Sequence, residues 1–247
     1  MFSLNVAAFH QRFSDFQLNT FNGSVFLVQN VNGCESDLAG ADKDTSAATG
    51  SCATNQVGPG VLSSGLEVES SLRPARDLAI GLGFTLTNTR YRNDLVGNDS
   101  GIPLDPALRL LPGHKLSNAP AVVATGSISW TPPIGDTGLR GLIYVDGRLT
   151  SDYNTGSDLF PQKEQDGYAL VNARVGIRGP RELWAIEFWA QNVFKQDYAQ
   201  VAFNSPFQAG AANAGVFPAA QYPGGTQIFS AFLAEPRTYG LTLRSRF

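Results

Sequence analysis

The chain has 247 residues and a formal net charge of −3, with 18 Lys and Arg against 21 Asp and Glu. This near balance provides no basic field to gather phosphates, so nucleic acid is not expected among its partners. Charged residues make up 16% of the chain, below the roughly 25% of ordinary soluble domains. No apolar run approaches the roughly 18 residues of a membrane-spanning helix, so any contact with a bilayer would be made by strands.

Apolar and polar residues alternate with a period of two in eight segments, and no segment has a convincing helical period. Near the N-terminus, for example, Leu4, Val6 and Ala8 form one face of such a segment. We therefore predict an all-β protein whose strands lie near residues 3–11, 66–69, 78–86, 122–130, 139–149, 168–177, 184–191 and 238–247. Each strand would have one apolar and one polar face.

The connections between these segments alternate in length. Short turns containing Pro or Gly lie at 73–76, 131–135 and 179–182, and long polar or Gly- and Ala-rich stretches lie at roughly 30–60, 93–114, 152–165 and 199–235. If the strands are antiparallel in sequence order, all short turns fall at one end and all long loops at the other. This asymmetry is typical of outer-membrane barrels and favours an antiparallel transmembrane β-barrel. A soluble β-sandwich binding module, with its apolar faces buried between two sheets, is the alternative.

The turn at 179–182 also predicts a strand register. Centring it between its second and third residues pairs Val175 with Ile186 on the apolar face. The same register brings Arg174 beside Glu187 on the polar face.

The two cysteines, Cys34 and Cys52, are separated by a stretch rich in Gly, Ser, Ala, Asp and Asn. They would be either two free thiols or a loop-closing disulfide, which we favour and which would indicate an oxidising compartment. Four ligands are needed for a metal site, and His10 and His114 are the only histidines, so no metal is expected.

No catalytic pattern emerges from the remaining polar residues. The chain has no Gly-x-Ser-x-Gly elbow for a hydrolase, and Gly81 and Gly83 lack the third glycine of a dinucleotide loop. The acidic residues at 152–166, which include Asp158, lack calcium-loop spacing and are expected to form a solvated loop. We therefore expect neither an enzyme nor a bound cofactor.

Four stretches resemble one family in the order that this family requires. Residues 235–247, with the sequence Glu-Pro-Arg-Thr-Tyr-Gly-Leu-Thr-Leu-Arg-Ser-Arg-Phe, look like the last strand of a TonB-dependent outer-membrane receptor. Residues 170–176 are similar to its antepenultimate strand, and residues 189–194 to its Asn-Leu-Phe motif. Residues 13–17 and 65–69 match the region some eight strands from the end.

This resemblance implies that residues 1–247 are the C-terminal part of a larger receptor barrel, about eight strands of it, without a plug domain or an export signal. It implies an outer-membrane protein that takes up a scarce nutrient, such as a ferric siderophore, cobalamin or a carbohydrate. Lipid and the outer-membrane assembly machinery would be partners, and TonB would act only through a plug. A self-contained eight-stranded barrel with a structural or adhesive role is a second alternative.

Two groups of site residues follow from this interpretation. The signal read by the assembly machinery would consist of Tyr239, Gly240, Leu241, Leu243 and Phe247. The charges facing the barrel lumen would be Glu67, Glu69, Arg140, Asp146, Arg148, Arg174, Glu187, Arg244 and Arg246. The arginines could steer an anionic ligand, or they could pair with carboxylates such as Asp146 and Glu187.

Overall fold

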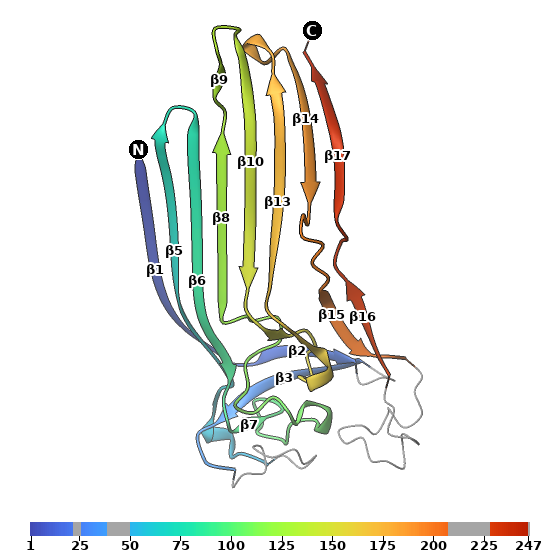
Figure 1. Cartoon of the computed structure of the whole chain (residues 1–247). Coiled ribbons are helices and arrows are strands. Elements are labelled where there is room, and N and C mark those ends of the chain that lie inside the picture. The colour runs from blue at the N-terminus through green and yellow to red at the C-terminus, as the bar shows by residue number, and fades with distance from the viewer. Residues whose placement is uncertain (22–25, 39–49, 207–227, 247) are drawn as a thin grey trace.

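The computed structural model describes residues 1–21, 26–38, 50–206 and 228–246. Its main feature is an antiparallel sheet of long strands that follow one another in sequence order (Figure 1), which confirms the predicted all-β class. We call this sheet the wall. In the described residues, no helix is long and apolar enough to cross a membrane.

The strands of the wall agree with the eight predicted segments and extend several of them. They are β1 (Phe2–Phe13), β5 (Val61–Ala75), β6 (Leu78–Tyr91), β8 (Val122–Trp130), β10 (Leu139–Thr150), β13 (Tyr168–Arg178), β14 (Trp184–Gln191) and β17 (Thr238–Ser245). The short strand β9 (Pro133–Ile134) pairs with the start of β10.

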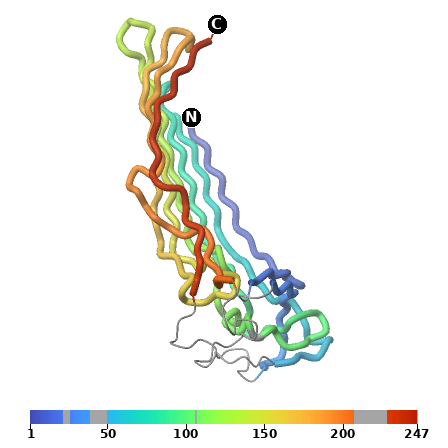
Figure 2. Tube along the Cα trace, turned by 90° about the vertical axis from the view of Figure 1, so that its right-hand side faces the viewer, coloured from blue at the N-terminus to red at the C-terminus, as the bar shows by residue number. Residues whose placement is uncertain are grey.

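Short turns connect the strands at one end of the wall, and long connections gather at the other end (Figures 1 and 2), as predicted. We call the described residues of these long connections, 14–21, 26–38, 50–60, 92–121, 151–167, 192–206 and 228–237, the loop layer. It contains the short strands β2 (Phe16–Phe21), β3 (Phe26–Cys34), β4 (Val57–Pro59), β7 (Leu95–Val96), β11 (Tyr153–Asn154), β12 (Glu164–Gln165), β15 (Ala199–Asn204) and β16 (Phe229–Leu233). Single 3-10 turns are present at η1 (Thr54–Gln56), η2 (Pro106–Leu108) and η3 (Pro161–Lys163), and η4 (Pro180–Glu182) forms the turn between β13 and β14.

The register of the wall sorts side chains onto two continuous faces. Residues directly opposite each other on neighbouring strands share a face. One row of the apolar face consists of Val6, Val68, Phe84 and Ala124. The adjacent row of the polar face consists of Asn5, Glu69, Gly83 and Thr125.

The apolar face is not covered by a second sheet. Val175, Ile186 and Phe188 are 47%, 48% and 48% exposed, whereas a sandwich would bury them. The sandwich alternative is therefore wrong, because in the described residues no layer packs over these side chains.

The wall is also open. Within the described residues, β1 pairs only with β5 and β17 pairs only with β14, so the strand order runs from one free edge to the other. The self-contained eight-stranded barrel is therefore wrong as well, since closure would need a ladder between β1 and β17.

The predicted register of the β13–β14 hairpin is wrong by two residues. Val175 lies opposite Phe188 rather than Ile186. The cause is the turn, in which the Gly179 N–H donates to the Trp184 carbonyl across four residues, with φ of 55° at Arg181. An ordinary two-residue type I turn fits the twist of a hairpin poorly, and the longer loop avoids it. A shift of two residues leaves every side chain on its predicted face.

Candidate functional site

The polar face of the wall is hollowed into a groove of about 580 Å³ that crosses β1, β5, β6, β8 and β10. Its lining includes Asn5, Glu69, Ser127, Tyr144, Asp146 and Arg148. Two glycines keep the floor of this groove low. A Cβ atom at Gly81 would lie 2.9 Å from Ser127 Oγ, and one at Gly83 would lie 2.5 Å from Thr125 Oγ1. Gly81 and Gly83, which do not form a dinucleotide loop, therefore deepen the groove on the polar face.

Glu187 is the most deeply buried charge of the polar face, with 1% of its side chain exposed. It accepts hydrogen bonds from Arg174 at 3.3 Å and from Arg178 at 3.2 Å. The proximity of Arg174 was predicted, but Arg178 was missed. The period-two alternation could have identified Arg178. It lies four residues after Arg174 on the same strand and therefore on the same polar face.

The other predicted polar-face charges are distributed along the wall. Arg140 forms an ion pair with Asp77 in the β5–β6 turn and also donates to the Thr131 carbonyl at 2.6 Å. Asp146 accepts from Asn172 Nδ2 at 2.9 Å rather than from an arginine. The rest lie as follows: Glu69 and Arg148 line the groove, Glu67 is exposed two residues from Glu69, and Arg244 and Arg246 line a small hollow with Glu187.

Three tyrosines form a cluster where the polar face meets the loop layer. The rings of Tyr168 and Tyr198 stack with centroids 4.1 Å apart, and the Tyr153 and Tyr168 hydroxyl oxygens are 3.4 Å apart. Partial burial, together with the neighbouring Tyr168, raises the pKa of Tyr198 above its usual range, so its hydroxyl stays neutral. Arg148 is close enough to interact electrostatically with Tyr168 and Tyr198. The cluster thus brings aromatic ring faces, hydroxyl groups and a cation close enough together to contact one ligand.

The loop layer has a buried core of its own. Its core residues, drawn from the long connections and from the adjoining ends of β5 and β6, are Leu18, Val31, Val61, Tyr91, Leu95, Leu104, Leu108, Leu111 and Leu159. The layer is therefore a packed structure at one end of the wall.

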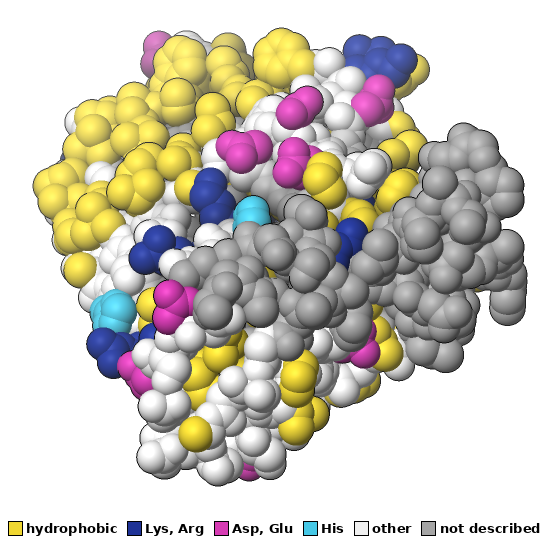
Figure 3. Space-filling view, turned by 90° about the horizontal axis from the view of Figure 1, so that it is seen from below, with side chains coloured by type: hydrophobic (Ala, Val, Ile, Leu, Met, Phe, Trp, Pro, Cys, Tyr) yellow, Lys and Arg dark blue, Asp and Glu magenta, His cyan; other side chains and the backbone are white. Residues whose placement is uncertain are grey.

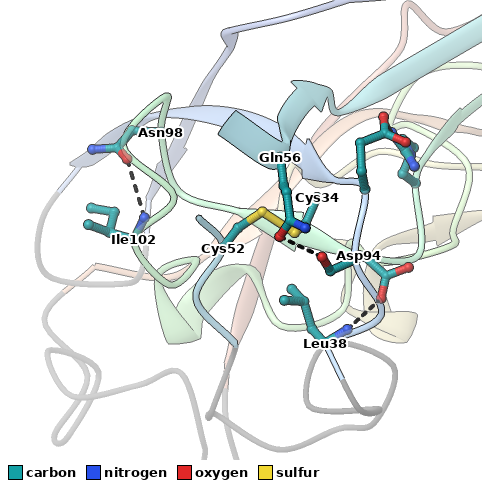
Figure 4. The surroundings of a disulfide bond; sticks show 10 residues. Cys34, Leu38, Cys52, Gln56, Asp94, Asn98 and Ile102 are labelled. Atoms are coloured by element: carbon teal, nitrogen blue, oxygen red, sulfur yellow. Dashed lines mark hydrogen bonds and ion pairs between the residues drawn. A yellow bond between two sulfur atoms is a disulfide. The ribbon is translucent and has the colours of Figure 1, made fainter. Parts of the chain in front are cut away.

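Cys34 and Cys52 form a disulfide in this layer, with Cα atoms 5.9 Å apart (Figure 4). Backbone hydrogen bonds hold both ends of the bridge against the β6–β8 connection: Cys34 N–H donates to the Asp94 carbonyl, and Cys52 N–H donates to the Gly101 carbonyl. The Asp94 side chain also accepts from the Leu38 N–H at 3.1 Å. The bridge thus closes the β3–β5 connection on itself, and the backbone hydrogen bonds fasten it to the β6–β8 connection.

An ion pair between Asp158 and Lys163 is buried at the centre of the loop layer, with each side chain 2% exposed. Lys163 Nζ donates to both carboxylate oxygens, at 2.7 and 2.6 Å, and burial lowers the pKa of Lys163. Asn204 of β15 bonds both Asp158 and the Phe21 carbonyl. The prediction of a solvated acidic loop is therefore wrong for Asp158, whose carboxylate joins its own connection to that of Asn204, which in turn bonds the β2 end.

The predicted assembly-signal residues lie on β17. Tyr239, Leu241 and Leu243 point from the apolar face with 62–70% exposure, and Gly240 lies under the indole of Trp189. Phe247 lies outside the described residues. Figure 3 shows the apolar face as a continuous hydrophobic area beside the charged loop end.

In the part of the chain that the structure describes, His, Cys, Asp and Glu side chains form no cluster that could hold a metal ion.

Comparison with known proteins finds a family match over most of the chain. Residues 1–193 match the family model described as TonB dependent receptor-like, beta-barrel. Among solved structures, the siderophore receptor PiuA from Acinetobacter baumannii is similar with a TM-score of 0.58 and 13% identity, over 98% of this chain and 26% of that chain. The ferric yersiniabactin uptake receptor FyuA from Yersinia pestis is similar with a TM-score of 0.56 and 16% identity, over 78% of this chain and 25% of that chain. The chain thus spans about a quarter of the length of these receptors.

Proposed function

The chain belongs to the family of TonB-dependent receptor-like β-barrels, and from this premise we propose that residues 1–247 form the C-terminal part of the barrel of a bacterial outer-membrane receptor. In this proposal the wall is barrel wall, its apolar face contacts lipid, and its polar face lines the lumen. TonB acts through a plug domain, and this part of the receptor supplies wall and external loops.

The observation that carries the proposal is the inverted arrangement of the wall. Side chains such as Phe188 and Leu243 are exposed over a whole sheet face, while the charged Glu187 is buried on the opposite face. Monomeric soluble proteins rarely expose continuous apolar patches larger than a few hundred Å². In a bilayer the same face contacts hydrocarbon, so its apolar side chains are not exposed to water.

The exposed strand edges support a larger barrel. A bilayer has no water to pair free backbone N–H and C=O groups, so spanning sheets must close. The edges of β1 and β17 would therefore pair with further strands of the receptor. Within the same proposal, the outer-membrane assembly machinery reads β17 through Tyr239, Gly240, Leu241, Leu243 and Phe247.

The tyrosine cluster supports a ferric siderophore as the nutrient, rather than cobalamin or a carbohydrate. Stacked rings suit a ligand with aromatic groups, and Arg148 beside Tyr168 and Tyr198 suits an anionic one. PiuA and FyuA are receptors for a siderophore and for ferric yersiniabactin. We therefore place one ligand contact at Tyr153, Tyr168 and Tyr198.

Titration of the purified receptor with an aromatic ferric siderophore, cyanocobalamin and a maltodextrin tests this proposal. Tyr198→Ala should weaken binding of the siderophore about three- to tenfold, the effect of a lost ring contact. Phe188→Ala, on the apolar face, is the matched control and should leave binding unchanged. Binding of only cobalamin or maltodextrin would overturn the ligand class, and a receptor that stays soluble without detergent would overturn the barrel.

A further inference from the structure

The ladder between β14 and β17 is interrupted where the wall meets the loop layer (Figure 1). Pairing stops at Gln191 with Thr238 and resumes at Ala199 with Leu233, in β15 and β16. Residues 192–198 belong to no strand. Their backbone N–H and C=O groups must therefore find partners outside a ladder.

Asn192 provides several of these partners from a buried position, with 6% of the residue exposed. Its Oδ1 accepts from the Gln196 N–H at 2.7 Å, and its Nδ2 donates to the Gln196 carbonyl at 2.8 Å. The carboxamide thus pairs with both backbone groups of one residue, as a neighbouring strand would. Nδ2 also donates to the Glu235 carbonyl on the opposite chain segment, at 3.4 Å. One side chain therefore joins both sides of the interruption.

The backbone at Asn192 is left-handed, with φ of 49°. Asparagine tolerates this conformation better than most side chains do. The Asn192 carbonyl also accepts from the Lys195 N–H at 2.9 Å, and φ at Lys195 is 56°, so residues 192–195 form a tight turn. Glycine would accept the same φ but has no amide side chain, and an ionised aspartate has no donor. Asparagine meets the backbone requirement and both hydrogen-bonding requirements.

The turn decides which face of the wall receives Tyr198. On β14 the odd positions, such as Glu187 and Gln191, lie on the polar face, so an unbroken strand would place Tyr198 on the apolar face. The turn changes this alternation, and the ring of Tyr198 stacks on Tyr168 at a centroid distance of 4.1 Å and an interplanar angle of 19°. The Ala234 N–H donates to the Tyr198 carbonyl at 2.9 Å, where the second ladder begins. The tyrosine cluster therefore depends on the turn.

The turn is also fastened to the wall. The Asn192 N–H donates to Asn172 Oδ1 at 3.0 Å, and Asn172 Nδ2 donates to Asp146 Oδ2 at 2.9 Å. Asp146 lines the groove of the polar face. Hydrogen bonds therefore run from the groove through Asn172 and Asn192 to Gln196, which precedes Tyr198 by two residues. Both asparagines belong to the stretches that resemble the receptor family.

From this geometry we infer that Asn192 is a positioning residue of the ligand site, whose carboxamide holds the Tyr198 ring against Tyr168 before the ligand arrives. The inference rests on the proposed function, which assigns the tyrosine cluster to an aromatic, anionic ligand. Without the carboxamide, Tyr198 would lose the anchor at Gln196 and would have to be ordered during binding. Ordering a side chain during binding lowers affinity, so the loss of the carboxamide should appear as weaker binding.

A double-mutant cycle in the full receptor tests this inference. It compares the wild type, Asn192→Gly, Tyr198→Ala and the variant with both changes, each titrated with a ferric tris-catechol siderophore in detergent. Glycine accepts the positive φ and removes only the carboxamide. Gln191→Gly is the matched control, because it removes the neighbouring amide, which accepts from Thr238 across the same pair of strands at 3.2 Å. Far-ultraviolet circular dichroism checks that each variant is folded.

Tyr198→Ala should weaken binding about three- to tenfold. Asn192→Gly should weaken it about two- to fivefold, because the ring remains present but is no longer held in place. In the Tyr198→Ala background, Asn192→Gly should have no further effect, and Gln191→Gly should bind like the wild type. Equal weakening by Asn192→Gly in both backgrounds, or no weakening in either, would overturn the inference.

A titration of the tyrosines without ligand gives a second readout. Burial and the neighbouring Tyr168 raise the pKa of Tyr198 above its usual range. If Asn192→Gly releases the ring, this pKa should fall towards the ordinary value of about 10, measured by ultraviolet difference spectra with Tyr198→Ala as the reference. Gln191→Gly should leave the pKa unchanged. A raised pKa that survives Asn192→Gly would show that other contacts hold the ring, and the inference would be wrong.

The same cycle separates the two proposals. If Tyr198→Ala binds the siderophore as tightly as the wild type, the proposed ligand contact fails and this inference fails with it. If Tyr198→Ala weakens binding and Asn192→Gly does not, only this inference fails.

Discussion

The wall and the loop layer place the same residue types in opposite environments. Leu243 of the wall is 68% exposed, whereas Leu95 and Leu111 of the loop layer are fully buried. In the proposed receptor, the wall faces hydrocarbon and the loop layer faces water. Stability in the layer therefore comes from removing apolar side chains from water, whereas under the proposed function the wall would gain the same free energy by insertion into lipid.

The boundary between the two regions runs through individual strands. On β5, the inward Val61 is buried in the loop core, while Val68, seven residues on, lies on the exposed apolar face. On β6, Tyr91 and Phe84 show the same contrast. Because a strand alternates faces at every residue, one strand can serve both regions without a bulge.

The strongest expected effect concerns the buried ion pair of the loop layer. Asp158→Ala leaves Lys163 buried without a partner and should raise the free energy of the folded layer by roughly 3–5 kcal/mol. Replacing both residues, as Asp158→Leu with Lys163→Met, should cost much less because no charge remains to be desolvated. Hydrogen exchange of the β2 amides measures the opening of the layer.

Asp152→Ala removes an exposed carboxylate of the same loop and is the matched control, with little change in exchange. If Asp158→Ala were as mild as Asp152→Ala, water would reach the pair and the layer would not be a dry core. The contrast between a dry loop core and an exposed apolar face of the wall would then no longer hold.

The wall should respond to charge according to face alone. Ile128→Arg places a cation on the apolar face near the middle of β8 and should cost roughly 2–4 kcal/mol in a bilayer. Ser127→Arg, one residue away, places the same charge opposite Asp146 on the polar face and should cost little. Unfolding by denaturant in lipid vesicles measures both, and equal costs would contradict the assignment of the faces.

Sequence periodicity was sufficient for the wall because its information is local. Each of the eight predicted segments is a strand, and even the wrong hairpin register kept every residue on its face. The register itself depended on the four-residue loop around Arg181. Arginine ordinarily avoids a positive φ, so the sequence does not predict this backbone conformation.

The loop layer could not be predicted in the same way because its partners are distant in sequence. The Thr20 hydroxyl donates to Ser157 at 2.8 Å across 137 positions. Asp158 looked like one of several solvated acids, and only the packing of Lys163, Phe160 and Asn204 around it makes it a core residue. Nothing in the local pattern of residues 152–166 distinguishes it from Asp152.

The disulfide should stabilise the loop layer without affecting the wall. Replacing Cys34 and Cys52 with Ser should reduce the stability of the layer by at most about 3 kcal/mol, the chain-entropy value for a loop of this size. Backbone hydrogen bonds to Asp94 and Gly101 persist and limit the loss. Limited proteolysis should cleave the β3–β5 connection faster, while resistance of the wall to denaturant stays unchanged. Loss of the wall as well would indicate that the two regions unfold together.

The smallest expected change in stability comes from removing a tyrosine hydroxyl, and its sign should differ between Tyr91 and Tyr168. The Tyr91 hydroxyl is buried without a hydrogen-bond partner in the described residues, so Tyr91→Phe should stabilise the loop layer by about 1 kcal/mol. Tyr168→Phe removes a hydroxyl that contacts Tyr153 at 3.4 Å and should instead cost about as much. Hydrogen exchange of the β7 and β11 amides reports the two changes. If Tyr91→Phe also destabilised the layer, its hydroxyl would have a partner, and the loop core would be wetter than an ordinary protein interior.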